Sequence, residues 1–491
     1  MPRTFTCFAI ACLACLVFAG PMAQPVRGED WPQFRGPNCG GVSLGEKPLP
    51  VHFSTTENLA WSAEVGDGVS SPVVAAGRAF TTAMRDETFV VYAFDAATGK
   101  KLWQRELATG PEPLPKITAP NSHAASTPAA DAERVYVYFS TLGLLAFDAA
   151  TGEPAWHCKL PVPYLVFDWG PAASPVLHGD AVLFCQDDDL QPAIYSIDKA
   201  SGEIRWKTER NEMLASYSCP VICQADDRDE IVVAGTGKLI GYDPADGHEL
   251  WHARVLLRNI KTSPVSQAGV VYVSLESAGI AQQWIAANDA DKDGKLSREE
   301  VPQPLWKKFD RGDANRDGFL ENEELDLAFL DPDNQAGTKW DAEEQQERFV
   351  LAVRGGGRGD VTGSHVVWRH ASRSPDSISS PLVLDGRIFL VKSGGLSSCF
   401  DTAAGEPLWS LKRIDNNATY YASPVAGDGK IYCAGENGLV AVLKQAEDVE
   451  VLAVNDLGES ILGTPAIADG RLFFRTRHKL MCVHQEMPRE E

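Results

Sequence analysis

Two twelve-residue stretches of the chain place oxygen-bearing side chains at regular intervals around a glycine. They cover residues 289–300 and 313–324, and each has an acid or amide at positions one, three and five, glycine at six and glutamate at twelve. Calcium takes about six to eight oxygen ligands in such loops, so the spacing predicts two calcium sites. The predicted ligands of the first site are Asp289, Asp291, Asp293, the Lys295 carbonyl, Ser297 through a water, and Glu300. Those of the second site are Asp313, Asn315, Asp317, the Phe319 carbonyl, Glu321 and Glu324.

Together the two stretches match the EF-hand pattern of paired calcium loops. Leu296 and Leu320 fall at position eight of each loop, where we expect a short β-bridge to join the pair. Residues 301–312 alone link the loops, and Pro302 and Pro304 shorten any helix there. We therefore expect a compact pair with a structural or buffering role, because an opening switch needs longer paired helices. The alternative is a vestigial pair that no longer binds metal.

The elements around these loops are organised by a repeat. A serine, threonine or cysteine followed by proline and an apolar residue recurs along the chain. One interval, from Pro264 to Pro381, is much longer than the others, so the acidic segment 281–347 is predicted to be an insertion into one repeated unit. The repeated prolines are Pro72, Pro128, Pro175, Pro220, Pro264, Pro381, Pro424 and Pro465.

Within a unit, aspartate, glycine and tryptophan follow one another in the order Asp-x-x-x-Gly-x-x-x-Trp. The glycine suits a turn position with positive φ, and the aspartate can accept hydrogen bonds from the turn backbone. The tryptophan offers a large surface to pack between neighbouring sheets. Copies of the signature end at Trp103, Trp156, Trp206, Trp251 and Trp409, with a variant ending at Trp368.

Eight units of four short strands predict an all-β, eight-bladed β-propeller with a small α-helical EF-hand insert in blade five. The last unit lacks one strand, and residues 58–65, with Trp61, are expected to supply it and close the ring; an open solenoid is the alternative. The predicted divisions are a signal peptide at 1–28, a lead segment at 29–57, blades one to five at 58–280, the insert at 281–347, the rest of the propeller at 348–485, and a tail at 486–491.

The units resemble those of the pyrroloquinoline-quinone-type propeller repeat family over roughly residues 58–485, without the insert. That family includes quinoprotein alcohol dehydrogenases and the propeller lipoprotein of the outer-membrane β-barrel assembly machinery. The lead at 30–37, Asp-Trp-Pro-Gln-Phe-Arg-Gly-Pro, resembles that of exported bacterial propellers of unassigned role. The resemblance implies the propeller fold and leaves both a catalyst and a scaffold open, because one fold hosts many functions.

The N-terminus has the order of a secretory signal, with Arg3, an apolar run over Phe5–Gly20, and then small and polar residues. We expect cleavage, export to the periplasm or cell envelope, and no transmembrane span in the mature chain. An uncleaved anchor and lipidation at Cys12 or Cys15 are the alternatives, and the later cysteines are compatible with disulfides or with buried thiols. The formal net charge of −22 argues against a nucleic-acid partner.

One face of the propeller is expected to gather the residues that bind a ligand. Loops between the second and third strands share a face with the links between blades, and the insert occupies such a loop in blade five. A funnel mouth is therefore predicted beneath the insert, with the acidic run 187–189 solvated at its rim. The candidate cofactor-binding residues are His123, Asp168, Trp169, Tyr217 and Lys261, with Asp67, Asn121, Asn259, Asp376 and Tyr420 on the same links.

Three functions compete for this funnel. The favoured interpretation is a non-catalytic, calcium-bound, monomeric module that binds a protein, peptide or glycan. The second is a pyrroloquinoline-quinone (PQQ)-dependent oxidoreductase similar to alcohol dehydrogenases, for which Asp168, Trp169 and Lys261 are suitable residue types. The dehydrogenases of that family carry adjacent cysteines near the cofactor, and no two cysteines adjoin here. The third is hydrolysis through His123 or the run 187–189; no catalytic residue is assigned.

Overall fold

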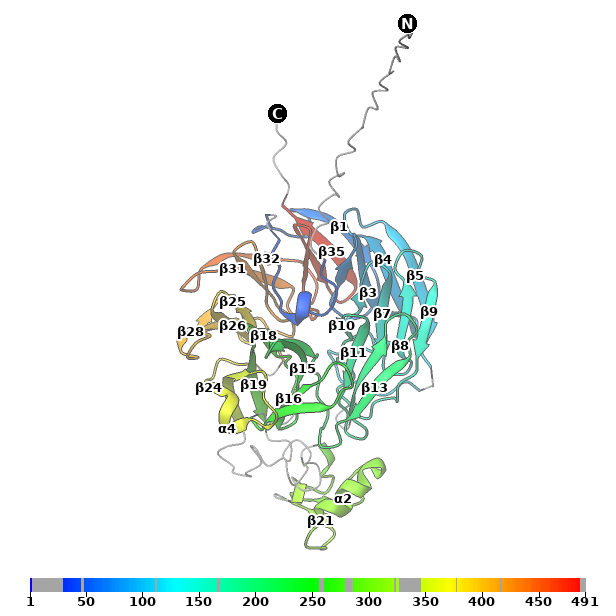
Figure 1. Ribbon diagram of the computed structural model, residues 1–491, viewed down its shortest axis with the longest axis vertical. Helices are drawn as coiled ribbons and strands as arrows, with labels where there is room; N and C mark the ends of the chain where they lie inside the picture. The colour runs from blue at the N-terminus through cyan, green and yellow to red at the C-terminus, as the bar shows by residue number, and fades with distance from the viewer. Residues whose placement is uncertain are drawn as a thin grey trace.

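Short antiparallel strands surround a central channel in the computed structural model (Figure 1). The structure describes Met1 and residues 30–485, apart from 46–47, 111–112, 166–167, 256–259, 279–284, 286, 322–323, 326–345, 377 and 416. Within these residues the strands form eight sheets of four or five strands and one two-stranded sheet, which confirms the predicted eight-bladed propeller. The predicted signal peptide after Met1, the predicted tail and Asn259 lie outside the described residues.

In the first four blades the strands follow one another from the channel outward. Blade one contains β2 (Val73–Ala75), β3 (Arg78–Arg85), β4 (Thr88–Asp95) and β5 (Lys101–Ala108). Blade two contains β6 (Ala129–Ala130), β7 (Arg134–Phe139), β8 (Gly143–Asp148) and β9 (Pro154–Cys158). Blade three contains β10 (Val176–His178), β11 (Ala181–Gln186), β12 (Ala193–Asp198) and β13 (Ile204–Glu209). Blade four contains β14 (Val221–Ala225), β15 (Arg228–Gly235), β16 (Lys238–Tyr242) and β17 (Glu249–Ala253), with β23 (Gly359–Asp360) parallel to its outer edge.

The remaining blades include the interrupted one and the closing one. Blade five contains β18 (Val265–Gln267), β19 (Val270–Ala278), β22 (Gln346–Arg354) and, after α4 (Thr362–His365), β24 (Val366–Ala371). Blade six contains β25 (Leu382–Leu384), β26 (Arg387–Lys392), β27 (Leu396–Asp401) and β28 (Pro407–Arg413). Blade seven contains β29 (Val425–Gly427), β30 (Lys430–Ala434), β31 (Leu439–Lys444) and β32 (Val451–Asp456). Blade eight contains β33 (Ala466–Ala468), β34 (Arg471–Arg475) and β35 (Lys479–His484), with β1 (Leu59–Glu64) as its outer strand, so closure by the N-terminal strand is confirmed.

Five of the outer-strand tryptophans dock on the turn of the following blade, whereas Trp251 packs against Gly241 and donates to Glu230 within its own blade. A Cβ added to Gly152 would come 2.6 Å from Cδ2 of Trp103, and the indole Nε1 donates to the Ala149 carbonyl at 3.1 Å. Gly152 has a φ of 71°, and the Asp148 carboxylate accepts the Thr151 amide at 2.8 Å, so the turn requires the predicted glycine and aspartate. The same contact pairs Trp61, Trp156, Trp206 and Trp368 with Gly99, Gly202, Gly247 and Gly405.

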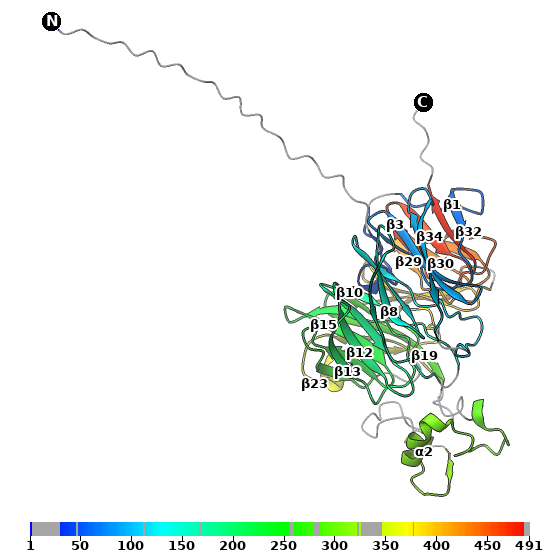
Figure 2. The same ribbon diagram turned by 90° about the vertical axis from the view of Figure 1, so that its right-hand side faces the viewer.

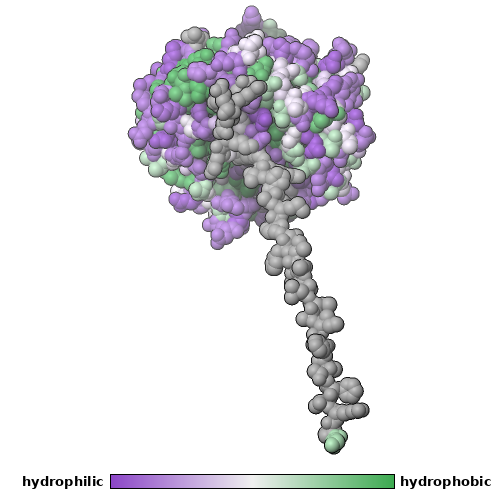
Figure 3. Space-filling model, turned by 90° about the horizontal axis from the view of Figure 1, so that it is seen from above, coloured by the Kyte–Doolittle hydropathy of each residue, from purple (hydrophilic) through white to green (hydrophobic). Residues whose placement is uncertain are grey.

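Apolar side chains fill the spaces between blades, while the outer rim is mixed. Phe89 of blade one stacks on Phe139 of blade two with ring centres 4.2 Å apart. The described cysteines are unpaired and buried. Scattered apolar residues such as Leu102 and Ile204 are exposed on outer strands. Figure 3 shows the side near the termini as mostly hydrophilic with small hydrophobic patches.

The insert leaves the propeller from the hairpin of β19 and β22, at the lower edge in Figures 1 and 2. Within it, η2 (Gln303–Leu305) and α2 (Trp306–Gly312) lie between β20 (Leu296–Ser297) and β21 (Phe319–Leu320). The latter two strands pair with Leu296 opposite Leu320, which is the predicted bridge. Across the described residues, no helix combines the length and apolar character that crossing a membrane requires.

Candidate functional site

The residue before each repeated proline lies at the wall of the central channel. In most blades it is a serine or threonine whose hydroxyl accepts the main-chain N–H of the equivalent residue in the preceding blade. The Ser71 amide donates to Thr127 Oγ1 at 3.0 Å, and the Thr464 amide donates to Ser71 Oγ at 2.9 Å, which closes the circle. We call this set the hydroxyl ring, although one member is a thiol. Its members are Ser71, Thr127, Ser174, Cys219, Ser263, Ser380, Ser423 and Thr464.

The lead segment closes one end of the channel. Trp31 exchanges two main-chain hydrogen bonds with Val74 of β2, and the Asn38 side chain bonds both main-chain groups of Ile222 in β14 at 2.7 and 2.8 Å. These bonds cover the free edges of the innermost strands. The lead includes η1 (Pro37–Cys39), the blue segment at the centre of Figure 1. Its Phe34 side chain contributes to the cavity above it.

A cavity of about 360 Å³ lies in the channel between the lead and the links that join the blades. It is lined by Phe34, by the hydroxyl ring and by residues of the links. Lys261 Nζ lies 4.4 Å from the centre of the Trp169 ring, a cation–π contact. The pKa of Lys261 is lowered because burial disfavours its charged form. The negative charges of Asp376 and Glu276 act in the opposite direction but do not cancel this effect. The described lining of the cavity thus combines one cation and several aromatic side chains with a circle of small polar groups.

Three of the five candidate cofactor-binding residues line this cavity, namely Trp169, Tyr217 and Lys261. His123 and Asp168 are not among its lining residues. Asp168 is exposed, with a φ of 52°. Burial lowers the pKa of His123, and its Nδ1 is buried without a hydrogen-bond partner among the described residues.

The expectation for Tyr420 is wrong. Tyr420 is fully buried, and its hydroxyl donates to Asp415. Its neighbour Tyr421 lines the cavity instead. Adjacent side chains of an extended segment point to opposite sides, so a shift of one position moves a side chain from the core to the channel.

The acidic run 187–189 is buried, so the expectation that it is solvated is also wrong. Asp187 forms a two-pronged ion pair with Arg210, with N–O distances of 2.7 and 2.9 Å. Asp188 accepts the main-chain amides of Leu190 and Gln191 at 2.7 and 2.6 Å. Asp189 accepts the Ala215 amide at 3.1 Å. These carboxylates hold loops together and are not free for hydrolytic chemistry.

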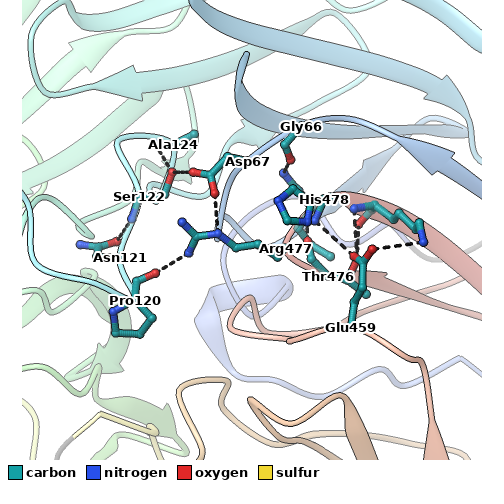
Figure 4. A network of polar contacts seen from close by, with 12 residues as sticks. Gly66, Asp67, Pro120, Asn121, Ser122, Ala124, Glu459, Thr476, Arg477 and His478 are labelled. Atoms are coloured by element: carbon teal, nitrogen blue, oxygen red, sulfur yellow. Dashed lines mark hydrogen bonds and ion pairs between the residues drawn. The ribbon is translucent and has the colours of Figure 1, made fainter. Parts of the chain in front are cut away.

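A polar network fixes one wall of the cavity where blades one, two and eight meet (Figure 4). Arg477 donates to the Asp67 carboxylate and to the Pro120 carbonyl. Asn121 donates through Nδ2 to the Trp169 carbonyl at 2.6 Å. Pro120, Asn121 and Trp169 all line the cavity, so the network holds the aromatic wall in place.

The first predicted calcium loop brings its acids together. Asp289, Asp291 and Asp293 each place one carboxylate oxygen within 4.8 Å of the others. The Asp293 amide donates a hydrogen bond to Asp291, and this bond acts to lower the pKa of Asp291. Desolvation and the negative charges of Asp293, Glu300 and Asp289 act in the opposite direction, and the net effect is a raised pKa. The Glu300 carboxylate accepts the Ser297 amide and hydroxyl, both at 2.8 Å. A cation would relieve this crowding of negative charge.

The second predicted loop contains buried oxygens without donors. Asp313 Oδ1 and Glu324 Oε2, at positions one and twelve, have no hydrogen-bond partner among the described residues. Glu324 is only 9% exposed. The Glu321 carboxylate lies 3.2 Å from Lys295 Nζ. Buried polar atoms are normally satisfied, so the two unpaired oxygens mark a position suited to a cation.

Comparisons with known proteins agree with this architecture. The sequence matches the family described as outer membrane protein assembly factor BamB over residues 51–163, 87–304 and 283–446. The chain belongs to the BamB family. BamB of Yersinia pestis is 26% identical over 413 residues, which cover 80% of this chain and 90% of that protein.

A solved structure shows the same fold. BamB from Moraxella catarrhalis has a TM-score of 0.52 at 15% identity and covers 87% of this chain and 99% of that chain. A quinohemoprotein alcohol dehydrogenase from Pseudomonas putida HK5 has a TM-score of 0.42 at 12% identity, covering 94% of this chain and 82% of that one. The latter likeness does not bear on function.

In this BamB-family chain, the lead and the hydroxyl ring form parts of the cavity that were not predicted from the sequence. The repeated Ser/Thr-Pro pair was the available signal for the ring, because a residue type that recurs in every blade lies at the same height in the channel. Phe34 carried no such signal, because it belongs to a segment outside the repeats.

Proposed function

We propose that this BamB-family protein is a non-catalytic recognition module of the cell envelope, with calcium bound in its insert. Its partner binds at the face that carries the links and the insert. The observation that carries the proposal is the cavity, which the lead closes at one end and which the links surround at the other. A concave site with an apolar lining and a few placed polar groups is typical of ligand binding.

The quinoprotein alternative requires groups that the cavity does not offer. A PQQ-dependent dehydrogenase needs a carboxylate base and carboxylate ligands for the calcium beside its quinone. Of the described residues that line the cavity, none is an aspartate or glutamate. Trp169 offers a surface for stacking, but Lys261 Nζ already lies over its ring at 4.4 Å. The lining therefore does not fit this cofactor chemistry, and we propose no oxidation step.

Calcium binding is supported by the two loops of the insert. The three converging acids of the first loop repel one another, and the second loop leaves Asp313 Oδ1 and Glu324 Oε2 buried and unpaired. Bound calcium would satisfy both, and it would stabilise the insert because it binds the folded loops only. The short α2, of seven residues, fits a structural pair.

The envelope location is supported by two independent observations. Residues 1–28 have the order of a secretory signal. The Yersinia pestis relative is named as an outer membrane protein assembly factor. That name makes an outer membrane protein, or another factor of its assembly, the first class of partner to test.

Site-specific photocrosslinking in cells that make the protein tests this function. A photoreactive amino acid is placed at Leu190, which is 44% exposed on a loop of the insert face, or at the exposed Asp227, on a turn of the opposite face. Crosslinks to an envelope protein are expected from Leu190 and not from Asp227. Equal yields from both faces, or none from Leu190, would reject the proposed binding face.

A further inference from the structure

The ammonium group of Lys261 lies in the cavity without a hydrogen bond or ion pair to any described residue. The two acids whose charges act on it have other partners. Glu276 pairs with two other basic residues at 2.7 Å each, and Asp376 accepts a main-chain amide at 2.6 Å. The Trp169 ring faces the ammonium but carries no formal charge. A desolvated cation without a counter-ion is unfavourable, so this cavity has a place for a negative group.

The aromatic side chain of Tyr217 lines the same cavity. Its Oη is buried, exposes no surface to the cavity and has no hydrogen-bond partner among the described residues. Burial and the charge of Asp189 raise the pKa of this phenol, so it stays protonated and neutral. The Tyr217 amide donates to the Ile260 carbonyl at 2.8 Å, so Tyr217 and Lys261 enter the cavity from adjoining links.

The rest of the lining is suited to an apolar group and offers further donors. Oxygens of the hydroxyl ring accept main-chain amides, which leaves the hydrogens of members such as Thr127 able to donate, although Ser174 already donates to the Ala172 carbonyl. No described lining residue is acidic. The volume of about 360 Å³ suits a small molecule or the end of a chain, not a folded domain. The apolar lining residues include Phe34, Val69, Ala172, Ile378 and Leu462.

We propose that this cavity binds the carboxylate of a ligand with an apolar body, through Lys261 Nζ. The proposal rests on the proposed function and names the chemistry that the module recognises. A charge-assisted hydrogen bond to a carboxylate would satisfy the ammonium, while the apolar body packs beside Trp169 and the ring of Tyr217. Two sources offer this chemistry, a free organic acid and the C-terminal carboxylate of a polypeptide.

Calorimetric titration of the mature protein tests the proposal with four probes. These are 3-phenylpropionate, its amide, and N-acetylated leucyl-phenylalanine with a free or an amidated C-terminus. Each acid that binds is expected to bind at least about tenfold more tightly than its amide. Lys261→Met should weaken the acid by about tenfold or more and leave the amide unchanged, and Lys261→Gln, which removes the charge but keeps a polar side chain, should act in the same direction. Lys412→Met, at a half-exposed lysine on the outer strand of blade six, is the matched control.

The outcomes separate the two sources and the two proposals. Binding of phenylpropionate alone identifies a free acid, and binding of the dipeptide alone identifies a chain end; both support the inference. Equal binding of acid and amide, or no binding of any probe, overturns it. If Lys261→Met fails a thermal-melting check of folding, Lys261→Gln decides the result. Crosslinks from Leu190 without acid binding would reject the carboxylate site alone, and acid binding without crosslinks would reject the partner-binding function alone.

Discussion

Leu214, in the link between blades three and four, and Leu320, in the second predicted calcium loop, belong to one buried hydrophobic cluster. Both side chains are fully buried. Tyr164, in the preceding link, packs against the same cluster. The insert therefore shares its core with the propeller. Leu214 and Tyr164 lie on the links that also carry Tyr217 and Trp169, which form aromatic walls of the cavity.

This shared core predicts that calcium binding in the insert affects the cavity. Calcium should slow amide hydrogen exchange in the insert and also in residues 160–165 and 213–217, because ordering the loops stabilises what packs on them. Leu214→Ser should keep the response of the insert and reduce that of the two links. The exposed Leu190→Ser is the control. An undiminished response of the links in Leu214→Ser would contradict the coupling.

The second calcium site should depend on Glu324. Glu324→Gln removes the charge at position twelve, so calorimetry should show a fall from two calcium ions per chain to one. Glu299→Gln is the control, because Glu299 is exposed and is not a predicted ligand. A variant that still binds two ions would reject this ligand assignment, and a wild-type protein that binds none would reject calcium binding altogether.

The repeated parts of the structure could be predicted because each blade buries the same side chains at the same spacing. The contact of Trp103 with Gly152 recurs around the ring, and the pairing of Leu296 with Leu320 follows from position within a loop. The lead could not be placed in this way. Asn38 contacts Ile222 across 184 positions of sequence, through hydrogen bonds to the main chain that leave no periodic pattern. Strand order alone determines on which face of the propeller each link lies. For that reason the sequence could predict Trp169, Tyr217 and Lys261 as candidates for the cavity.

The acidic run was misjudged because its partner lies elsewhere in the sequence, and this gives a prediction. Asp187 and Arg210 are 2% and 1% exposed, and their closest atoms are 2.7 Å apart. Asp187→Asn leaves the buried guanidinium without an anion and should lower the free energy of unfolding by about 3–5 kcal/mol in urea denaturation. Glu153→Gln, which breaks a more exposed pair with Arg105, should cost less than about 1 kcal/mol. Similar costs for the two variants would show that the buried pair is not structurally important.

Docking of tryptophan on glycine should be measurable with two alanine variants that share a backbone conformation. Gly152 and Gly77 have φ values of 71° and 75°, but only Gly152 faces a tryptophan, and no atom lies within 4 Å of a Cβ at Gly77. Gly77→Ala should cost about 1–2 kcal/mol through the backbone alone. Gly152→Ala should cost about 1–3 kcal/mol more, because Trp103 must move. Equal losses of unfolding free energy would mean that the indole contact contributes nothing.

The lowered pKa of Lys261 predicts opposite effects of pH on stability and on carboxylate binding. Burial places this pKa below the ordinary value of 10.5, although Asp376 and Glu276 act against the shift. Between the folded pKa and 10.5 the unfolded chain binds more protons than the folded one, so the contribution of Lys261 to the free energy of unfolding rises with pH. Over the same window the ammonium is lost, so the affinity for 3-phenylpropionate should fall. Urea titrations and calorimetry across this range should show both trends in the wild type and in Lys412→Met, and neither trend in Lys261→Met. If the stability and the affinity of Lys261→Met still changed with pH as in the wild type, the titrating group would be a different residue.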